Sequence, residues 1–440
     1  MSTLASGAGW LEARELLRDC VHCGFCLPAC PTYLLWAEEM DSPRGRIHLM
    51  GQVLDGAGLE ASTVLHFDRC LSCMACVGAC PSGVRYDVLI EQVRAEVERE
   101  APRRLAERLL RRGVFALFPY PRRLALARLL LGAAERTGLR SLVRTTVARR
   151  LLPAPLHTME SLAPPLGRRA PLPHRLPAVG RRRGRIGLLA GCVQRVFFSE
   201  VNAATARVLA AEGFEVVVPE PQGCCGALSS HAGREQEAAR FARATIEVFE
   251  RAEIDAAVVN AAGCGSAMKG YGRLLRQDPA YAERAAAFSK RTRDVAELLA
   301  DLGQVASYRP VPGVVAYQDA CHLAHAQGLR AEPRSVLRAV PQLEVREIAE
   351  PELCCGSAGV YNLLQPEAGR LLGDRKASNV LATGADLLVS ANPGCLMQVR
   401  AALARTGTTV PVAHLVQVLD ASIRGVGLAD VTLGSGERSG

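Results

Sequence analysis

The sequence has no long uninterrupted apolar run, and it is poor in lysine and in aromatic residues. Its best apolar candidate, residues 124–134, is too short to cross a membrane and contains Arg128, so we expect no transmembrane helix. The N-terminus lacks the basic start and apolar core of a secretory signal, and Glu12 and Glu15 stand where that core would be. These absences predict a cytoplasmic chain. Arginine outnumbers lysine 50 to 3, which we attribute to genome composition.

Size and composition permit a well-folded, multidomain chain. Of its 440 residues 49% are hydrophobic, so about three domains with cores of their own are expected. Sixteen cysteines in a reducing compartment are typical of metal ligands or redox groups and not of a disulfide framework. The cysteine pattern is therefore the main guide to function.

The cysteines of the N-terminal part form two compact blocks with the same spacing. Each block reads C-x2-C-x2-C-x3-C-P, at residues 20–31 and 70–81. Thiols two residues apart on a tight loop can face one point, which suits three corners of an iron-sulfur cube, and in two-cluster ferredoxins the fourth cysteine binds the other cluster. We therefore assign one 4Fe-4S cluster to Cys20, Cys23, Cys26 and Cys80, and a second to Cys70, Cys73, Cys76 and Cys30.

Zinc is the alternative metal, because its sites also use C-x2-C pairs. Two compact quartets that each end in Cys-Pro favour iron-sulfur instead. Between the blocks, MDSPRGRIHLM offers Ser42 and Pro43 as a helix start, followed by Arg44 and Arg46. Two interpretations of these arginines stay open: a solvated first turn, or tuning of a cluster's potential. A helical pattern fills the spacer, so a mostly helical two-cluster domain is expected over residues 1–100.

Residues 101–150 carry 13 arginines against two glutamates, and their net charge of +11 exceeds the +9 of the whole chain. Arginines alternate with leucines at helical spacing, which predicts basic amphipathic helices, and a Pro/Arg linker follows up to residue 185. The segment would be a bridge with solvated or paired arginines, or it would attach to an anionic membrane or an acidic partner subunit. Nucleic acid is disfavoured as a partner, because aromatic side chains are few and no binding module is recognisable.

The other eight cysteines belong to a duplicated unit. Each copy contains a Cys-Cys-Gly sequence and short β-branched runs separated by helical patterns, so each is expected to be α/β. The first copy would span residues 186–312 and the second 313–425, with a flexible tail over 426–440. Cys192, Cys224, Cys225 and Cys264 recur as Cys321, Cys354, Cys355 and Cys395, at offsets of 129 to 131 residues.

In each unit the cysteines come shortly after predicted strands. Parallel α/β sheets collect ligands at the carboxyl ends of their strands, so three loops can bring four thiols to one rim, and Gly226 or Gly356 lets the backbone approach closely. Inert core cysteine is the alternative, but eight duplicated loop positions favour metal binding or redox use. His322, directly after the first cysteine of the second unit, is a candidate ligand, proton donor or helix-start residue. His231 and His325 are weaker candidates.

The paired cysteine blocks, the intervening MDSPRGRI and the two Cys-Cys-Gly units together resemble the glycolate oxidase (glycolate dehydrogenase) iron-sulfur subunit. The resemblance covers nearly the whole chain, within a superfamily that includes lactate-utilisation, anaerobic glycerol-3-phosphate dehydrogenase and heterodisulfide reductase subunits. It implies a ligand role for the eight cysteines of the two blocks. Heterodisulfide reductases often finish each Cys-Cys-Gly unit with a C-x2-C pair, whereas Cys264 and Cys395 have no such partner. This departure disfavours the unusual clusters used for disulfide cleavage and leaves one or two ordinary four-thiolate clusters open.

The resemblance implies an α+β multidomain protein, with a two-cluster ferredoxin-like domain followed by the two α/β units, that serves as an electron-transfer subunit. Oxidation of glycolate to glyoxylate removes two electrons as hydride, which needs an organic cofactor such as flavin. No dinucleotide fingerprint opens a strand-helix unit in this chain, so we expect neither flavin nor NAD nor a catalytic residue on it. Substrate would be oxidised on flavin-containing partner subunits, and this chain would pass electrons to a quinone or similar membrane acceptor.

On this interpretation the basic segment would dock the complex peripherally on the cytoplasmic face of the inner membrane. The close alternatives are an iron-sulfur subunit of a lactate or glycerol-3-phosphate dehydrogenase. In other classes, the alternatives are a thiol-disulfide reductase that cleaves a substrate disulfide directly, and a structural metal-bound scaffold.

Overall fold

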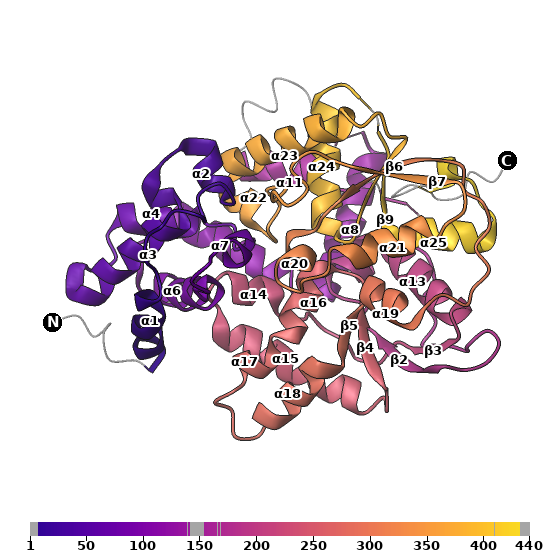
Figure 1. Cartoon of the computed structure of the whole chain (residues 1–440), viewed down its shortest axis with the longest axis horizontal. Coiled ribbons are helices and arrows are strands. Elements are labelled where there is room, and N and C mark those ends of the chain that lie inside the picture. Colours follow the sequence, from indigo (N-terminus) through magenta and orange to yellow (C-terminus); the bar gives the residue numbers. More distant parts are fainter. Residues whose placement is uncertain are drawn as a thin grey trace.

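The helical N-terminal domain forms one end of the molecule and the two α/β units form the other (Figure 1). The computed structural model describes residues 8–138, 140, 154–164, 166–167, 169–408 and 410–431. The first seven residues, residues 141–153 of the basic segment and residues 432–440 of the expected tail therefore lie outside the described residues. In the described part, no helix is long and apolar enough to cross a membrane.

Prolines and a serine cap start the helices of the N-terminal domain. Pro31 and Pro43 stand in the first turn, where a missing N–H is tolerated, and the Ser42 hydroxyl accepts a hydrogen bond from the Gly45 N–H at 3.0 Å. The predicted helix start and the mostly helical domain are confirmed. The elements are α1 (Ala8–Arg18), α2 (Pro31–Trp36), η2 (Glu39–Asp41), α3 (Pro43–Gln52), η3 (Val53–Ala57), α4 (Ala61–Asp68), α5 (Ala75–Gly78) and α6 (Tyr86–Glu100).

Thiols are part of the hydrophobic core of this domain. Phe67, Leu89 and Ile90 are fully buried at its centre, and Cys70 and Cys76 pack in the same cluster. The loops that carry the cysteines are therefore held by apolar packing as well as by whatever the thiols bind.

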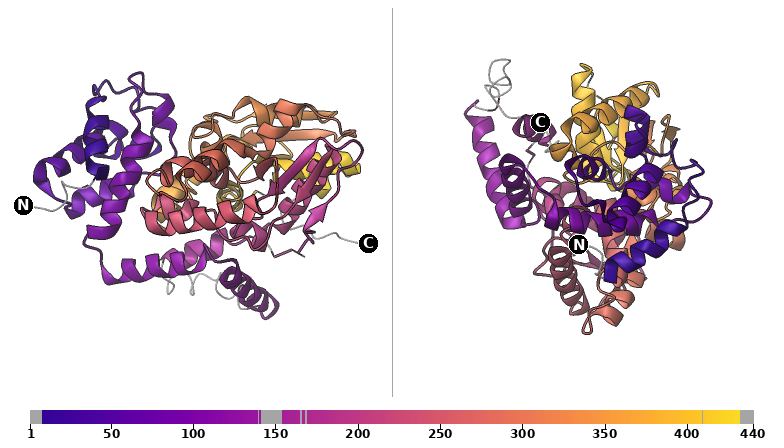
Figure 2. Two further views of the ribbon diagram at one scale, coloured as in Figure 1. Left: turned by 90° about the horizontal axis from the view of Figure 1, so that it is seen from below. Right: turned by 90° about the vertical axis from the view of Figure 1, so that its left-hand side faces the viewer.

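Among the described residues, α7 (Leu105–Leu117) and α8 (Pro121–Arg136) lie in the basic segment, and α11 (Ala154–Leu162) lies in the stretch expected to be a Pro/Arg linker. Figure 2 shows helices of this segment along one outer side of the molecule, next to the α/β units. The exposed faces of α7 and α8 carry leucines as well as arginines, with Leu105, Leu129 and Leu130 each more than 60% exposed. This segment thus leaves a mixed apolar and basic surface in contact with solvent.

Two sheets with the same strand order form the cores of the duplicated units. The first sheet has the order β1-β3-β2-β4-β5 and the second β7-β6-β8-β9, and every pair is parallel except β1 with β3. Without β1 the two orders coincide, which confirms the duplicated α/β units. The strands are β1 (Arg175–Leu176), β2 (Gly184–Leu188), β3 (Phe214–Val217), β4 (Ala256–Val259), β5 (Thr292–Asp294), β6 (Gly313–Gln318), β7 (Leu343–Glu347), β8 (Leu387–Ser390) and β9 (Val412–His414).

Helices cover both sheets. Those of the first unit are α12 (Val193–Phe197), α13 (Ser199–Ala211), α14 (Ala227–His231), α15 (Glu235–Glu250), α16 (Ala262–Lys269), α17 (Tyr271–Leu274), α18 (Ala282–Arg291) and α19 (Val295–Leu302). Those of the second unit are α20 (Cys321–Ala324), α21 (Ala331–Arg338), α22 (Tyr361–Leu364), α23 (Pro366–Leu381), α24 (Pro393–Arg405), α25 (Leu415–Arg424) and η4 (Leu428–Asp430).

The two units share one hydrophobic core. A single cluster of buried side chains includes Leu188 and Val208 from the first unit and Val315, Leu388 and Val416 from the second. Helix α13 packs against α25, and Arg207 of the first forms an ion pair with Asp420 of the second at 2.6 Å. The two units therefore pack together as one body.

The glycines of α3 give a test of the N-terminal packing. A Cβ at Gly45 would collide with the Glu39 backbone carbonyl, whereas a Cβ at Gly51 in the same helix meets nothing within 4 Å. We expect Gly45→Ala to lower the free energy of unfolding by about 1–3 kcal/mol through overpacking. The control Gly51→Ala should raise it by up to about 1 kcal/mol, since alanine favours helix. Chemical denaturation measures both, and equal effects would contradict the packing.

Candidate functional site

The first cysteine block surrounds a cavity at the surface of the N-terminal domain. Its loop leaves α1 and turns tightly, with positive φ at His22 and Gly24. The lining of the cavity includes Cys20, Cys23 and Cys26 together with Cys76 and Cys80 of the other block. Cys23 is exposed to solvent, and beside it the loop side chains of Val21 and Phe25 are 69% and 67% exposed.

The second cysteine block surrounds an interior cavity. Cys70, Cys73 and Cys76 line it together with Cys30 of the first block, and all four are buried. The fourth cysteine of each block thus lies against the cavity of the other block. This is the arrangement that crossed ligation requires.

Charge near the second cavity differs from thiol to thiol. Burial raises the pKa of Cys73 and of Cys76, and the neighbouring thiolates add to the rise. Burial also acts on Cys70, but the charges of Arg46 and Arg94 and a hydrogen bond from the Ser72 N–H at 3.4 Å hold its pKa below the ordinary value. Cys70 is therefore the member of this block that is most readily a thiolate.

The two arginines of the MDSPRGRI stretch have separate roles. Arg46 is fully buried, and its guanidinium lies 3.9 Å from the Cys30 sulfur and 3.4 Å from the Asp41 carboxylate. Arg44 lies at the other cavity, where it donates to the His22 carbonyl at 3.0 Å and pairs with Glu39. Of the two open interpretations, burial beside the thiols favours charge tuning for Arg46.

Each duplicated unit brings its four thiols together at the carboxyl ends of its strands. In the first unit Cys192 and Cys224 lie 3.7 Å apart, and in the second Cys321 and Cys354 lie 3.9 Å apart. The remaining contacts join Cys225 to Cys224 and Cys264, and Cys355 to Cys354 and Cys395. No group of cysteine, histidine or acidic side chains among the described residues has the spacing of a site for a single metal ion.

The second cysteine of each Cys-Cys-Gly motif has a thiol pKa below its ordinary value. Hydrogen bonds from Cys224 and Cys264 lower the pKa of Cys225, and the equivalent partners lower the pKa of Cys355. The glycine that follows has φ of 84° at Gly226 and 85° at Gly356, and a Cβ at either would press on the backbone of the covering helix. The predicted close backbone approach is therefore present at both glycines.

The two thiol quartets face one common cavity. All eight cysteines of the duplicated units line it, along with Leu71 of the N-terminal domain and the rings of His231 and His322. The sequence predicts a rim of thiols for each unit, but it gives no sign that the two rims face each other. That arrangement follows from the shared core, which fixes the carboxyl ends of both sheets relative to one another.

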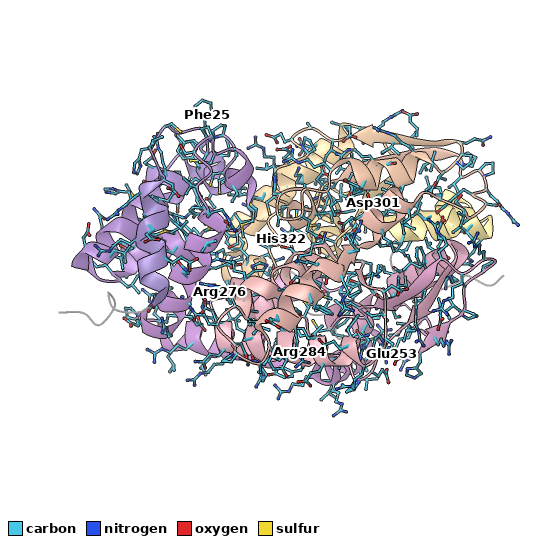
Figure 3. The ribbon with its side chains drawn as sticks, turned by 60° about the horizontal axis from the view of Figure 1, so that its bottom comes forward. Phe25, Glu253, Arg276, Arg284, Asp301 and His322 are labelled. Carbon is cyan, nitrogen blue, oxygen red and sulfur yellow. The ribbon has the colours of Figure 1, made fainter. Side chains whose placement is uncertain are left out.

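The candidate histidines divide into two groups. The rings of His231 and His322 lie 4.7 Å apart, and burial lowers the pKa of His231 well below its ordinary value and that of His322 to about 4. Both are therefore neutral at neutral pH. His325 is not part of this ring contact; its Nε2 lies 3.0 Å from the Glu352 carbonyl oxygen and its Nδ1 lies 3.2 Å from Arg330. Figure 3 shows His322 in the interior, far from Phe25 at the edge of the N-terminal domain.

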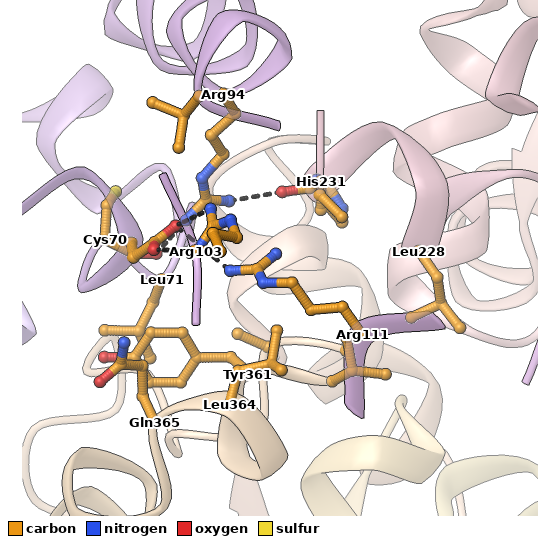
Figure 4. Close-up of a pocket in the computed structure, with 16 residues that line it drawn as sticks. Cys70, Leu71, Arg94, Arg103, Arg111, Leu228, His231, Tyr361, Leu364 and Gln365 are labelled. Atoms are coloured by element: carbon orange, nitrogen blue, oxygen red, sulfur yellow. Dashed lines mark hydrogen bonds and ion pairs between the residues drawn. The ribbon is translucent and has the colours of Figure 1, made fainter. Parts of the chain in front are cut away.

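A pocket at the junction of the N-terminal domain and the units holds a side chain that the sequence does not single out. Figure 4 shows Arg94 of α6 donating to the His231 carbonyl, at 2.7 Å, and to the Cys70 carbonyl. Arg94 also donates to the Ser72 hydroxyl at 2.5 Å. Arg94 is one of 50 arginines, and no local motif distinguishes it. Only the packing of distant segments reveals its position.

The donor set suits iron-sulfur clusters. The two cavities of the N-terminal domain offer sulfur ligands without carboxylates, and hydrogen-bond donors such as the Tyr86 hydroxyl, 3.6 Å from the Cys70 sulfur, accompany them. Four thiolates with hydrogen bonds to sulfur are the usual environment of a 4Fe-4S cluster.

Comparison with known proteins agrees with this chemistry. Three families match segments of the chain: the 4Fe-4S dicluster domain at residues 19–84, the linker region of the glycolate oxidase iron-sulfur subunit at 106–163, and the cysteine-rich domain at 186–269 and 315–400. The probable glycolate oxidase iron-sulfur subunit of Bacillus subtilis is 38% identical over 96% of this chain and 94% of its own length. The chain belongs to the glycolate oxidase iron-sulfur subunit family.

A second relative with a similar name supports this assignment. The glycolate oxidase iron-sulfur subunit of Escherichia coli is 36% identical, and the match covers 94% of this chain and 96% of the relative. Lactate utilization protein A of Exiguobacterium is 28% identical over only 54% of this chain. Among solved structures, a hypothetical protein from Helicobacter pylori has a TM-score of 0.55 over 94% of this chain and 72% of its own, at 9% identity, which shows a common fold only.

Replacement of Arg46 tests charge tuning in this iron-sulfur subunit. Arg46→Gln removes a buried positive charge beside Cys30 and Cys70, so the reduced and more negative state should become less stable. We expect the midpoint potential of one cluster to fall on the order of 100 mV, measured by redox titration with spin-resonance detection. Arg44→Gln at the exposed site is the matched control and should change it far less. A potential unaffected by Arg46→Gln at full iron content would contradict the assignment.

Proposed function

We propose that this chain is the electron-transfer subunit of a flavin-dependent glycolate oxidase, and that it relays electrons from glycolate oxidation on partner subunits to a quinone or similar acceptor. One observation carries the proposal: the fourth cysteine of each block lies against the cavity of the other block. This arrangement provides two complete thiol quartets close together, as a chain of redox centres requires.

The proposed ligands follow from these cavities. One 4Fe-4S cluster would be held by Cys20, Cys23, Cys26 and Cys80, and the other by Cys30, Cys70, Cys73 and Cys76. One or two further clusters would be held by the quartets of the duplicated units, Cys192, Cys224, Cys225 and Cys264, and Cys321, Cys354, Cys355 and Cys395. When bound, such clusters supply one-electron transfer at potentials that their surroundings set.

The side chains of this chain hold the thiols in place, exclude water from the second site and set the local charge. Cys30, Cys70, Cys73 and Cys76 are buried, while Cys23 is exposed, so the first site meets solvent and the second does not. The exposed first site, bordered by Val21 and Phe25, suits electron exchange with a partner subunit, because transfer needs close approach. Arg46 and Arg94 place positive charge beside the second site.

Glycolate oxidation itself belongs on partner subunits. Removal of a hydride from glycolate needs an organic cofactor, and the sequence has no dinucleotide fingerprint that opens a strand-helix unit. The relatives that match almost the whole chain are named as iron-sulfur subunits of glycolate oxidase, whereas lactate-utilisation relatives match about half of it. Glycolate is therefore the proposed substrate of the complex, oxidised on a flavin-containing subunit.

We further propose that the exposed face of α7 and α8 holds the complex on an anionic membrane at the cytoplasmic side. The two glutamates of the basic segment pair with buried arginines, Glu107 with Arg111 and Glu135 with Arg140, so little negative charge remains on the outer face. On α8, leucines form the middle of that face and arginines flank them at both ends. Basic ends and an apolar centre suit the boundary between lipid headgroups and acyl chains.

Loss of a ligand thiol tests the relay. Cys26→Ser should remove about 4 of the about 8 iron atoms that two 4Fe-4S clusters bring, and should abolish acceptor reduction by the assembled complex. The partner flavin should still be reduced by glycolate, since that step precedes the relay. Iron and sulfide analysis of anaerobic protein and stopped-flow flavin spectra measure the two effects, with Gly51→Ala of α3, where a Cβ meets nothing within 4 Å, as control. Unchanged acceptor reduction in Cys26→Ser would end the relay proposal, and disulfide reduction by the chain alone would favour a thiol-disulfide reductase.

Vesicle binding tests the membrane face. Replacement of Leu126, Leu129 and Leu130 together by serine should weaken binding to vesicles with anionic lipid more than tenfold, because each leucine contributes apolar burial of about 1–3 kcal/mol. The matched control is Leu302→Ser with Val305→Ser, which changes exposed apolar residues on the duplicated units. Sedimentation with vesicles of neutral and of anionic lipid gives the affinities. Equal binding by both variants would contradict a membrane role, and loss of partner-subunit binding instead would point to a protein interface.

A further inference from the structure

We propose that electrons cross between the N-terminal domain and the duplicated units at one junction, where the second cysteine block meets the second unit, and that His322 is the positioning residue of this junction. The inference rests on the proposed function. It adds an order to the relay, because it makes the second unit, and not the first, the neighbour of the N-terminal clusters.

Direct packing joins the second block to the second unit. One apolar cluster contains Leu71, Cys73 and Ala75 of the block together with Cys321 and Cys354 of the second unit. Leu353 and Tyr361 of the second unit also belong to the buried part of this cluster. Thiols of the second unit therefore pack in the same apolar cluster as Cys73.

The first unit meets the same block differently. Cys192, Cys224 and Cys225 belong to an apolar cluster whose described members include no residue of the N-terminal domain. Where Cys225 does face the block, it lines a groove with Met74 and with polar side chains such as Gln92. In this groove, open space and polar groups lie between Cys225 and the block, and elsewhere Leu71 of the block faces the cavity that both units share.

His322 connects the two sides of the junction. It follows Cys321 directly, it is 8% exposed, and its ring lies against the backbone of Ser72, the residue before Cys73. Its Nδ1 has no hydrogen-bond partner in the described part of the chain. A single non-covalent contact, between the His322 ring and the Ser72 backbone, therefore separates two covalent segments that end at Cys73 and Cys321.

Two further contacts fix the Ser72 end of this path. Arg94 bonds to the Ser72 hydroxyl and to the His231 carbonyl, at 2.5 and 2.7 Å, and the Tyr361 hydroxyl donates to the Arg69 carbonyl at 2.9 Å. His231 in turn packs its ring against that of His322. The loop that carries Cys70 and Cys73 is thus fastened to the first unit through Arg94, and it contacts the second unit directly.

The residues of the junction break the internal duplication. The position after the first cysteine is Val193 in the first unit and His322 in the second, and at the 130-residue offset of the Cys-Cys-Gly motif His231 corresponds to Tyr361. Lys376, which is fully buried and whose charge helps to lower the pKa of Cys355, corresponds to Ile246 at the same offset. The first unit forms the same sheet with other residues at these positions. The differences lie where the second unit faces the junction or its own thiols.

The step at the junction is a transfer of one electron. Cys30, Cys70, Cys73 and Cys76 would hold the cluster that gives up the electron, and the thiols of the second unit would hold the one that accepts it, with the partner flavin of the proposed function as the source. No bond forms or breaks, and no proton is needed. His322 acts through its contacts with Ser72 and Cys321, so its expected effect is on the rate and on the coupling of the two centres.

Spin coupling tests which unit is the neighbour. In the full-length chain, purified without oxygen and reduced, the signal of the second block should be broadened by an adjacent paramagnetic centre. Cys321→Ser with Cys354→Ser should remove the broadening, and the matched pair Cys192→Ser with Cys224→Ser should keep it. The reverse pattern, or a native signal without broadening, would overturn the inference while leaving the two N-terminal clusters of the proposed function intact. Absence of N-terminal cluster signals would instead overturn the proposed function.

Substitution of His322 tests the bridge without removing a thiol. In the assembled complex reduced by glycolate, His322→Leu should slow arrival of electrons in the second unit on the order of tenfold, the effect of a lost positioning contact, as followed by rapid-freeze spin resonance. His322→Gln, which keeps an N–H donor, should restore most of the rate, and Val193→Leu in the first unit is the control. Iron content and the KM for glycolate should stay unchanged. Equal rates in His322→Leu and the native complex, or equal loss in both His322 variants, would reject the bridge.

Discussion

The structure depends on one constraint: thiols that lie far apart in the sequence must meet in places that water reaches poorly. Thiolates are costly to bury unless something compensates their charge. The chain meets this constraint by exchanging the fourth cysteines of the two blocks, so that Cys30 stands with the second block and Cys80 with the first. The exchange binds the two halves of the N-terminal domain to each other and places Arg46 and Arg94 where their charges face the deeper thiols.

Much of the architecture could be predicted from the sequence, because local pattern specifies it. Short apolar or β-branched runs indicate β2, β3, β4, β6 and β8, the alternating run LEVRE indicates β7, and the constant cysteine offsets reveal the duplication. Strands β5 and β9 were not predicted, since Thr292–Asp294 and Val412–His414 have three residues each and contain polar side chains. Strands this short are set by their neighbours in the sheet and carry no readable period of their own.

The candidate site was predictable in its ligands but not in its arrangement. Spacing brings the thiols of one block together, because the distances along the chain are short. The common cavity between the units, the position of Arg94 beside Ser72 and the contact between His231 and His322 join segments more than 20 residues apart. Such contacts follow from tertiary packing, and a lone arginine or histidine in a sequence gives no sign of it. For the same reason the sequence leaves the roles of Arg44 and Arg46 open. The structure places Arg44 at the surface cavity and Arg46 in the interior.

The single core that runs through both duplicated units has a mechanical meaning. Because Leu188, Val315 and Leu388 pack in one cluster, the two sheets cannot rotate against each other without opening apolar surface to water. The separation between the facing sets of sulfur atoms is consequently a constant of the fold and not a variable of domain motion. Electrons that passed through this half of the molecule would cross fixed distances, and no domain motion would limit their transfer.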